Sequence, residues 1–321
     1  MKKILLILIV PFLALNCKAQ KEEKQGLTIT TEEVKTIVSY LASDELKGRN
    51  TGTYGIDAAA DYIQKELKSY GVRPYFENFK DEFKFKSRAE DSITGYNVVG
   101  YLEGNDDKLK NEFVVIGAHY DHIGFGRKVE NDSIANGAND NATGTATVMS
   151  IAKYLADKKN NKRSVIFALF SAEEMDLRGS ADLAKKLKAK NIDLYTMLNF
   201  EMLGVPFKGR DYDVFLTGFD RSNFASKFNE YQGSNVIGFS DVSKKYSLFM
   251  RSDNYAFFQE FNVPSHTISS CDLTNFDHYH KVGDEADKMN YEFMSSFINK
   301  AMSGIEILIN TPTKEILLNE E

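Results

Sequence analysis

The amino-acid sequence predicts an α/β fold, a three-layer sandwich in which helices flank a mixed, largely parallel central β-sheet. Short apolar runs alternate along the chain with longer segments whose apolar residues recur at helical spacing. The apolar runs are continuous rather than alternating with polar residues, which is typical of strands buried on both faces. In such a sheet a ligand site lies at the carboxyl ends of the parallel strands.

Two kinds of segment make up this alternation. The helical segments are residues 30–41, 54–71, 145–159 and 179–190. The continuous apolar runs are residues 96–102, 112–118, 163–170, 196–200, 213–218 and 263–269. The second helical segment has its apolar residues on one face, and Gly71 supplies its stop signal.

The composition is that of an ordinary globular protein. Of the 321 residues, 42% are hydrophobic and 27% are charged, which allows one large core or two small ones. The formal net charge is −6 and no basic cluster could follow a phosphate backbone, so nucleic acid is not an expected partner. Because no repeat or linker interrupts the chain, we expect one domain over residues 27–310 and a polar tail over residues 311–321.

The N-terminal segment has the features of an export signal. Two lysines precede an apolar run of twelve positions, residues 4–15, which is too short to span a bilayer comfortably. Cys17 follows the sequence LALN, which resembles a relaxed lipobox; simple secretion with cleavage after Ala19 is the alternative. We expect residues 1–19 to be a lipoprotein-type signal peptide with Cys17 as the lipid attachment point. The protein would then be an outer-membrane or cell-surface lipoprotein, or periplasmic or secreted.

Side chains able to bind metal follow four of the predicted strands. HYDHIG follows residues 112–118, SAEEMD follows residues 163–170, Glu201 follows residues 196–200, and FDHYHKVGDEAD comes shortly after residues 263–269. A single His or carboxylate at such a place is usually a surface, packing or helix-capping residue. Four such ends around one sheet are poorly explained by chance. Imidazoles and carboxylates without cysteine suit zinc in a site that keeps an open position for water.

The sequence GANDNATG, residues 137–144, places one acid among small neighbours. Asn and Asp are common in turns and helix caps, so an N-cap is the simplest explanation of this stretch taken alone. Two metal ions ~3.5–4 Å apart need a bridging carboxylate, and small neighbours would let the backbone bring Asp140 between them. The four strand ends favour this second interpretation.

Seven stretches together resemble a known family. LASDELKGRNTGTYG, GAHYDHIG, NGANDNATG, FSAEEMDLRGS, NFEMLG, RSDNYAFF and DHYHKVGDEAD occur in the order found in the co-catalytic zinc aminopeptidases of the bacterial leucyl aminopeptidase and aminopeptidase Y type, in metallopeptidase clan MH. The resemblance runs from about residue 39 to residue 290, and the combination of motifs makes it specific. It implies a zinc exopeptidase fold, two zinc ions per chain, and removal of N-terminal residues from peptides with a free α-amine.

The resemblance also implies a set of metal ligands. His119 would bind one zinc, Asp140 would bridge the two, and Glu174 and His280 would bind the other. One ligand departs from the family pattern, because well-studied members have Asp in NFDM whereas this chain has NFEM, with Glu201 at that position. Glu keeps the oxygen donors and adds a methylene group of about 1.5 Å. We expect Glu201 to remain a ligand, which requires that its strand end lies slightly further back.

The catalytic residues implied by the resemblance are Glu173, Tyr279 and Asp121. Glu173 would be the general base that takes a proton from a metal-bridging water and passes it to the leaving amine. Tyr279 would stabilise the oxyanion of the tetrahedral intermediate. Asp121 would orient the imidazole of His119 and fix its tautomer.

Several residues near the motifs receive no catalytic role. His122, His266 and His278 are interpreted as surface or packing residues, and Arg49 in KGRNTG as a residue that holds its own loop. The pocket for the first side chain of a peptide is expected to use residues 246–258 and the loop around Phe276, both rich in aromatics. A weak preference for an apolar first residue follows.

Two other functions remain open. Glutaminyl-peptide cyclotransferases have a similar fold, but they resemble one another in active-site tryptophans and usually a single zinc, whereas this chain has no Trp. The second alternative is a catalytically inactive binding lipoprotein on a peptidase scaffold. Such scaffolds usually lose the base or a ligand, and only Glu201 is altered here. Formation of pyroglutamate, or metal binding without turnover, would distinguish these functions from the peptidase.

Overall fold

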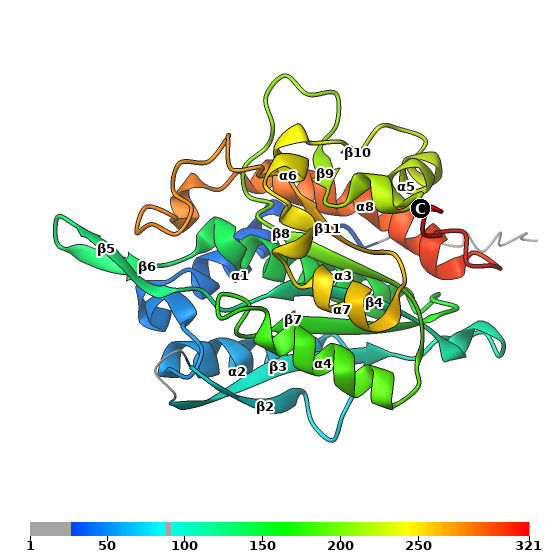
Figure 1. The fold of residues 1–321 in the computed structure, drawn as a ribbon, viewed down its shortest axis with the longest axis horizontal. Helices are drawn as coiled ribbons and strands as arrows, with labels where there is room; N and C mark the ends of the chain where they lie inside the picture. Colours follow the sequence, from blue (N-terminus) through cyan, green and yellow to red (C-terminus); the bar gives the residue numbers. More distant parts are fainter. Residues whose placement is uncertain (1–26, 88–90, 321) are drawn as a thin grey trace, which may run out of the picture.

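A nine-stranded sheet lies between two layers of helices in the computed structural model, which describes residues 27–87 and 91–320 (Figure 1). The strand order is β1-β3-β7-β4-β8-β11-β9-β10, and β2 also pairs with β3. The strands are β1 (Arg73–Pro74), β2 (Lys80–Lys86), β3 (Ser92–Leu102), β4 (Glu112–His119), β7 (Ser164–Phe170), β8 (Asp193–Glu201), β9 (Val214–Leu216), β10 (Ile237–Gly238) and β11 (Ser265–Ser269).

The centre of the sheet is parallel and its flanks are mixed. β4 pairs in parallel with β7 and with β8, and β8 pairs in parallel with β11. β3 runs antiparallel to β7, β1 and β2, and β9 runs antiparallel to β11 but parallel to β10. This confirms the predicted three-layer α/β sandwich, and each of the six apolar runs supplies one of the strands β3, β4, β7, β8, β9 and β11.

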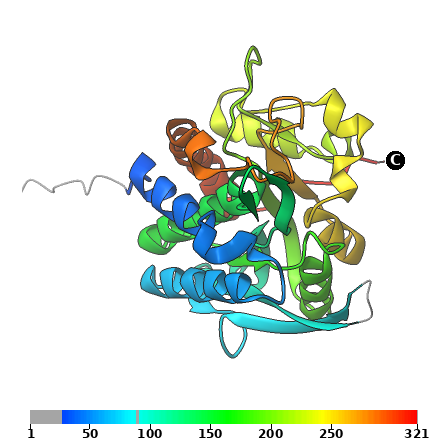
Figure 2. The same ribbon diagram turned by 90° about the vertical axis from the view of Figure 1, so that its left-hand side faces the viewer.

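Helices cover both faces of the sheet, as Figure 2 shows from the side. One layer consists of α1 (Thr31–Leu41), α2 (Tyr54–Ser69), α3 (Thr143–Lys158), α5 (Phe224–Gln232) and α8 (Tyr291–Asn310). The other consists of α4 (Arg178–Ala189) and α7 (Asn254–Phe261). The short helix α6 (Asp241–Lys245) lies at the top of Figure 1 and packs against the turn η5 (Leu248–Met250). After α2, Gly71 has a φ of +87°, a conformation that glycine adopts without steric cost.

The alternation of side chains along the strands explains why the apolar runs are continuous. In β4, Val114 and Ile116 pack into the core under the larger helical layer, whereas Val115 packs into the core under α4 and α7. All three side chains are fully buried. Since successive residues of a strand face opposite sides, a sheet with two covered faces requires apolar residues at every position.

A hairpin of β5 (Gly124–Val129) and β6 (Asp132–Ala135) projects from the body of the molecule at the left of Figure 1. It begins just after the carboxyl end of β4 and leads directly into residues 137–144. The turn η3 (Ala138–Ala142) in this stretch then runs into α3. The hairpin therefore connects two of the segments in which we predicted metal ligands.

The C-terminal residues lie against the domain. Ile316 is 1% exposed, and its N–H donates a hydrogen bond to the hydroxyl of Tyr195 at 2.9 Å. Arg163 donates to the carbonyl oxygen of Thr311 at 2.6 Å. The segment that we expected to be a polar tail is thus held by a buried apolar side chain and by hydrogen bonds to Arg163, just before β7, and to Tyr195 in β8.

The predicted signal peptide, with Cys17, lies outside the described residues. Within the part of the chain that the structure describes, no helix combines the length and the hydropathy needed to cross a bilayer.

Candidate metal centre

The predicted ligands meet at the carboxyl edge of the parallel strands. His119 is the last residue of β4 and Glu201 is the last residue of β8. Glu174 follows β7, and His280 lies in the loop after β11. Parallel neighbours end at the same edge of a sheet, so side chains far apart in the sequence converge there.

Two groups of potential ligands share the carboxylate of Asp140. In the first group, Nε2 of His119 lies 3.1 Å from Oε1 of Glu201 and 3.3 Å from Oδ1 of Asp140. The other oxygen of Asp140, Oδ2, belongs to the second group, where it lies 3.3 Å from Nε2 of His280. One carboxylate thus faces a different set of donors with each oxygen, which is the arrangement that we predicted for a bridging ligand.

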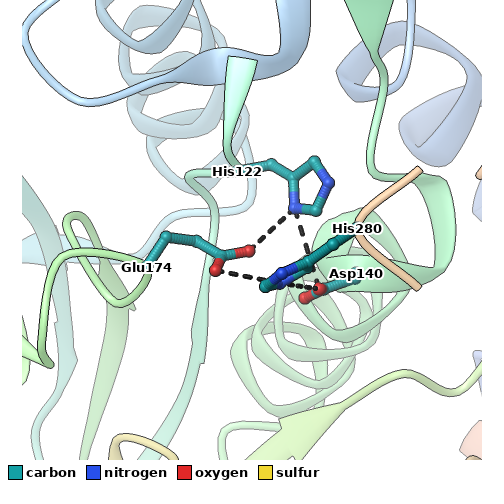
Figure 3. A group of neighbouring side chains, drawn as sticks. All are labelled: His122, Asp140, Glu174 and His280. Atoms are coloured by element: carbon teal, nitrogen blue, oxygen red, sulfur yellow. Dashed lines mark ion pairs between the residues drawn. The ribbon is translucent and has the colours of Figure 1, made fainter. Parts of the chain in front are cut away.

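The second group contains a residue that was not predicted as a ligand. Nδ1 of His122 lies 2.9 Å from Oε1 of Glu174 and 3.7 Å from Oδ2 of Asp140 (Figure 3). His280 approaches the other oxygen of Glu174 at 3.0 Å. The side chain of His122 is fully buried, so the structure places it inside the ligand group and not on the surface.

The second group has the features of a cation site. His122 Nδ1, His280 Nε2, Asp140 Oδ2 and Glu174 Oε1 are buried and make no hydrogen bond to any described residue, although they lie close together. Buried polar atoms are rarely left without a partner, and these lone pairs are directed at one another. A cation among them would satisfy all four. Imidazole and carboxylate donors in groups of three and four fit zinc.

The electrostatics agree with this fit. Burial acts to raise the pKa of Asp140, but its interactions with His119 and His280 outweigh burial and hold that pKa below the ordinary range. Burial acts to lower the pKa of His280, but Asp140 and Glu174 raise it to about 10. Carboxylates that draw protons onto neighbouring imidazoles also favour a metal cation, whose binding displaces those protons.

The loop that carries Asp140 is fixed from three sides. Asp284 accepts hydrogen bonds from the backbone N–H of Asn139 at 2.7 Å and from that of Asp140 at 3.0 Å. Asn141 uses its side-chain oxygen to accept from the backbone N–H of Met202 at 3.0 Å, which ties the loop to the end of β8. The Asp140–Asn141 peptide bond is cis. Asn139 accepts from the backbone N–H of Gly204 at 2.9 Å, and Asn141 also accepts from that of Gly144 at 3.0 Å. The two asparagines therefore connect the loop to the chain after β8, and Asn141 in addition caps the first turn of α3.

Arg49 holds the loop from the third side. Its guanidinium is fully buried and donates to the carbonyl oxygens of Asn136 at 2.6 Å, Gly137 at 2.9 Å and Tyr120 at 2.7 Å. Burial lowers the pKa of Arg49 to about 10, so it remains cationic at neutral pH. We predicted that Arg49 holds its own loop; it also connects the residues that follow His119 to those that precede Asp140.

Asp121 has a different set of partners from the one we predicted. The imidazole Nδ1 of His119 lies 3.1 Å from the backbone carbonyl oxygen of Asp121 and 3.7 Å from its carboxylate. The carboxylate instead accepts from the backbone N–H of Glu173 at 3.1 Å and of Glu174 at 3.4 Å. The backbone of Asp121 thus orients His119, and its side chain positions the two glutamates.

Glu173 and Tyr279 face the same cavity as Asp140 and Glu201. Burial raises the pKa of Glu173 well above its usual value, and the carboxylates of Glu201 and Asp253 add to this rise although His119 opposes it. A raised pKa suits a general base that must later act as an acid. Burial, with the charges of Asp140 and Glu174, also raises the pKa of Tyr279, so its hydroxyl keeps its proton and can donate a hydrogen bond.

The cavity beside the ligand groups opens to solvent. The segment 246–258 contributes Leu248 and Arg251 to its lining, and the loop after β11 contributes Leu273 and Tyr279. Phe276 is not among the lining residues, because its ring is 7% exposed and packs in the core. Both segments that we expected to form the pocket thus contribute side chains to this cavity.

The other two histidines lie away from the ligand groups. His266 is buried in β11, where it contacts Ser222 and Thr217. His278 is half-buried, and its ring lies 5.5 Å from that of Phe276. His122 was the residue that sequence reasoning missed; its signal was a second imidazole three positions after His119, where the chain leaves the sheet edge.

The two ligand groups point to a metal-dependent enzyme, and a family comparison identifies its class. Residues 97–303 match Peptidase family M28, and the chain belongs to that family. A probable zinc metalloprotease of Leptosphaeria maculans is 31% identical over 202 residues, 58% of this chain and 44% of that protein. Leucine aminopeptidase 2 of Trichophyton rubrum is 29% identical over 175 residues, 54% of this chain and 33% of that protein. The chain thus spans less than half the length of these curated relatives.

Solved structures share the fold at low sequence identity. An aminopeptidase from Aneurinibacillus sp. strain AM-1 superposes with a TM-score of 0.65 at 16% identity, covering 87% of this chain and 93% of that one. A glutaminyl cyclase from Porphyromonas gingivalis superposes with a TM-score of 0.68 at 14% identity, covering 86% and 97%. Because peptidases and cyclases share this architecture, the fold does not choose between them.

Proposed function

We propose that the chain is a zinc-dependent aminopeptidase that removes N-terminal residues from peptides, with one zinc ion in each ligand group. The observation that carries the proposal is the carboxylate of Asp140, which faces His119 with one oxygen and His280 with the other. Membership of Peptidase family M28 and the similarity to a leucine aminopeptidase support it.

The residues around the ligand groups have separate roles in the proposed reaction. Zinc bound there would polarise the scissile carbonyl group and lower the pKa of an attacking water. Glu173 takes the proton from that water and delivers it to the leaving amine, a transfer for which its raised pKa is suited. Tyr279 donates its hydroxyl hydrogen to the oxyanion that develops on the substrate.

The lining of the cavity supports cleavage at an N-terminus. Three carboxylates, those of Asp140, Glu173 and Glu201, line the same cavity as the apolar side chains of Met202 and Phe215. A free α-ammonium group is stabilised beside carboxylates, while the first side chain enters the apolar part. An N-acetylated peptide lacks that charge and is expected to fail as a substrate.

The test compares leucyl-p-nitroanilide with its N-acetylated form, in the presence of zinc, for the protein and for Glu173→Gln. We expect cleavage of the free-amine substrate alone, reduced by ~10²–10⁴-fold in the variant. An N-terminal Gln peptide, analysed by mass spectrometry, distinguishes release of Gln from loss of ammonia by cyclisation. Pyroglutamate formation without peptide cleavage, or zinc binding without turnover of any peptide tested, would contradict the proposal.

We further propose that the protein is exported as a lipoprotein. The support is the sequence of residues 1–19, where two lysines, a short apolar run and Cys17 follow one another. Cys17→Ser removes the thiol to which a lipid would attach, so the protein should no longer partition into detergent or incorporate labelled fatty acid. If the unaltered protein itself stays in the aqueous phase and incorporates no fatty acid, simple secretion with cleavage after Ala19 is favoured instead.

A further inference from the structure

The cavity beside the ligand groups has an apolar wall. Phe215, Leu248 and Leu273 line it, together with the sulfur-containing side chains of Met202 and Cys271. Such a wall packs against the methylene groups of a substrate side chain but does not discriminate between terminal functional groups. Selectivity must therefore come from the polar groups of the same cavity.

The threonine and serine hydroxyl groups in the cavity are already engaged with the protein. Thr217 accepts from the backbone N–H of Thr267 at 3.0 Å, and Thr267 donates to the side-chain oxygen of Asn254 at 2.7 Å. Ser269 donates to the carbonyl oxygen of Cys271 at 3.2 Å and accepts from its N–H at 3.1 Å. These hydroxyls hold the wall together.

Arg251 is the cation of the cavity lining. Within residues 27–87 and 91–320, its guanidinium has no hydrogen bond, ion pair or ring contact that would engage it. Several other arginines of the chain are engaged; for example, Arg163 pairs with Glu112 at 2.8 Å, and Arg221 lies 4.6 Å above the ring of Phe249. Arg251 is exposed, so its charge does not need a protein partner to be tolerated.

The backbone on the C-terminal side of Arg251 is fixed. Ser252 accepts a hydrogen bond from the amide of Asn199 in β8 at 2.8 Å. Asn254 donates to the carbonyl oxygens of Phe249 at 3.1 Å and Ser265 at 3.2 Å. Anchors on β8 and β11 therefore hold the chain beside Arg251 against the sheet, so its base is set at the cavity and only its side chain is free to adjust.

We propose that Arg251 selects peptides whose first residue ends in a hydrogen-bond acceptor, above all glutamate. The apolar wall packs against the methylene groups of such a residue, and the guanidinium forms a bidentate salt bridge with its carboxylate. The carboxylates of Asp140, Glu173 and Glu201 lie toward the ligand groups, where they face the α-ammonium of the substrate. A first residue with a cationic side chain is disfavoured by Arg251. This inference rests on the proposed aminopeptidase function.

The test measures kcat/KM for glutamyl-, leucyl- and lysyl-p-nitroanilide with the zinc-loaded full chain and with Arg251→Gln, Arg251→Glu and Arg251→Lys. We expect Arg251→Glu to lower the glutamyl-to-leucyl ratio by about tenfold or more and to raise the lysyl-to-leucyl ratio. Arg251→Lys should recover part of the glutamyl ratio because it retains the charge. Arg127→Gln is the matched control, because Arg127 is exposed on the β5–β6 hairpin and does not line the cavity.

The outcomes separate this inference from the function on which it rests. Turnover of the leucyl substrate with ratios that Arg251→Glu does not change would overturn the role of Arg251 and leave the aminopeptidase intact. Absence of turnover for all substrates would instead contradict the proposed function. Calorimetric binding of a glutamyl and a lysyl peptide to Glu173→Gln, with and without Arg251→Glu, reports on the pocket in either case. Equal affinities for both peptides in the presence of Arg251 would also overturn the inference.

Discussion

The carboxylate of Asp121 accepts a hydrogen bond from the backbone N–H of Glu173 at 3.1 Å. Its second oxygen lies 3.4 Å from the N–H of Glu174, the next residue. Asp121 is 1% exposed, so water does not compete for these bonds. Asp121, two residues after the end of β4, thus sets the position of both the proposed base and a proposed ligand after β7.

Asp121→Asn is expected to lower kcat by about 10- to 100-fold, because hydrogen bonds to a charged acceptor contribute ~1.5–3 kcal/mol and an amide has only one acceptor oxygen. Steady-state kinetics with a free-amine substrate measure the loss, and zinc content shows whether Glu174 still binds. Asp107→Asn is the control, because the side chain of Asp107 is 94% exposed. An unchanged kcat would mean that the loop after β7 holds Glu173 without Asp121.

His122→Ala is expected to weaken zinc binding at the second ligand group by at least ~10–100-fold, which is the loss of affinity when an outer partner of a metal ligand is removed. The reason is the 2.9 Å approach of its Nδ1 to Glu174 within the second ligand group. Competition with a chromophoric chelator measures both affinities. His278→Ala is the matched control, since His278 lies in neither ligand group. Equal zinc affinities in the two variants would show that His122 is a packing residue and not a metal ligand.

The core of the fold could be predicted because each buried strand leaves a pattern within its own short stretch of sequence. Each strand buried on both faces needs a continuous apolar run, and all six such runs proved to be strands of the sheet. The two-residue strands β1 and β10 and the β5–β6 hairpin carry no such run, since they lie at edges or project into solvent. Their pairing depends on neighbours distant in the sequence, which a local pattern does not contain.

The site could be predicted as a set of residue types but not as a set of contacts. The resemblance supplied His119, Asp140, Glu174, Glu201 and His280, and the structure brings all five together. It gave no reason to choose His122, because only the fold shows that the chain after β4 turns this ring toward Glu174. The partners of Asp121 were missed for the same reason, because a sequence motif does not show which backbone N–H groups a side chain will bind.

Glu201→Asp tests whether the extra methylene group is needed. Glu201 ends β8 with Oε1 3.1 Å from Nε2 of His119, and Asp would withdraw the carboxylate by about 1.5 Å. Metal–ligand distances tolerate only about 0.2 Å, so we expect the zinc affinity of the first group to fall at least ~10-fold while the second group keeps its ion. Chelator competition measures both, with the exposed Glu292→Asp as control. Unchanged or tighter zinc binding in Glu201→Asp would show that the strand end can move.

His266 gives a prediction about stability that does not depend on metal. Its Nδ1–H donates to the carbonyl oxygen of Thr217 at 2.8 Å, and its Nε2 accepts from the hydroxyl of Ser222 at 2.7 Å. Both bonds fit a neutral ring, because a protonated Nε2 could not accept. Burial lowers the pKa of His266 to about 4, and the positive charge of Arg221 acts in the same direction, although the bond to Thr217 opposes it.

The pH dependence follows from the sign of this shift. The unfolded chain takes up a proton near pH 6.5 and the folded chain only near pH 4, so the free energy of unfolding falls as the pH decreases between these values. Between pH 7 and pH 4.5 the loss from this residue is about 2 kcal/mol. Urea unfolding of the metal-free protein should therefore show a steeper acid loss than that of His266→Gln. An imidazole NMR signal of His266 that titrates near pH 6.5 in the folded protein would contradict the prediction, even if His266→Gln does not fold.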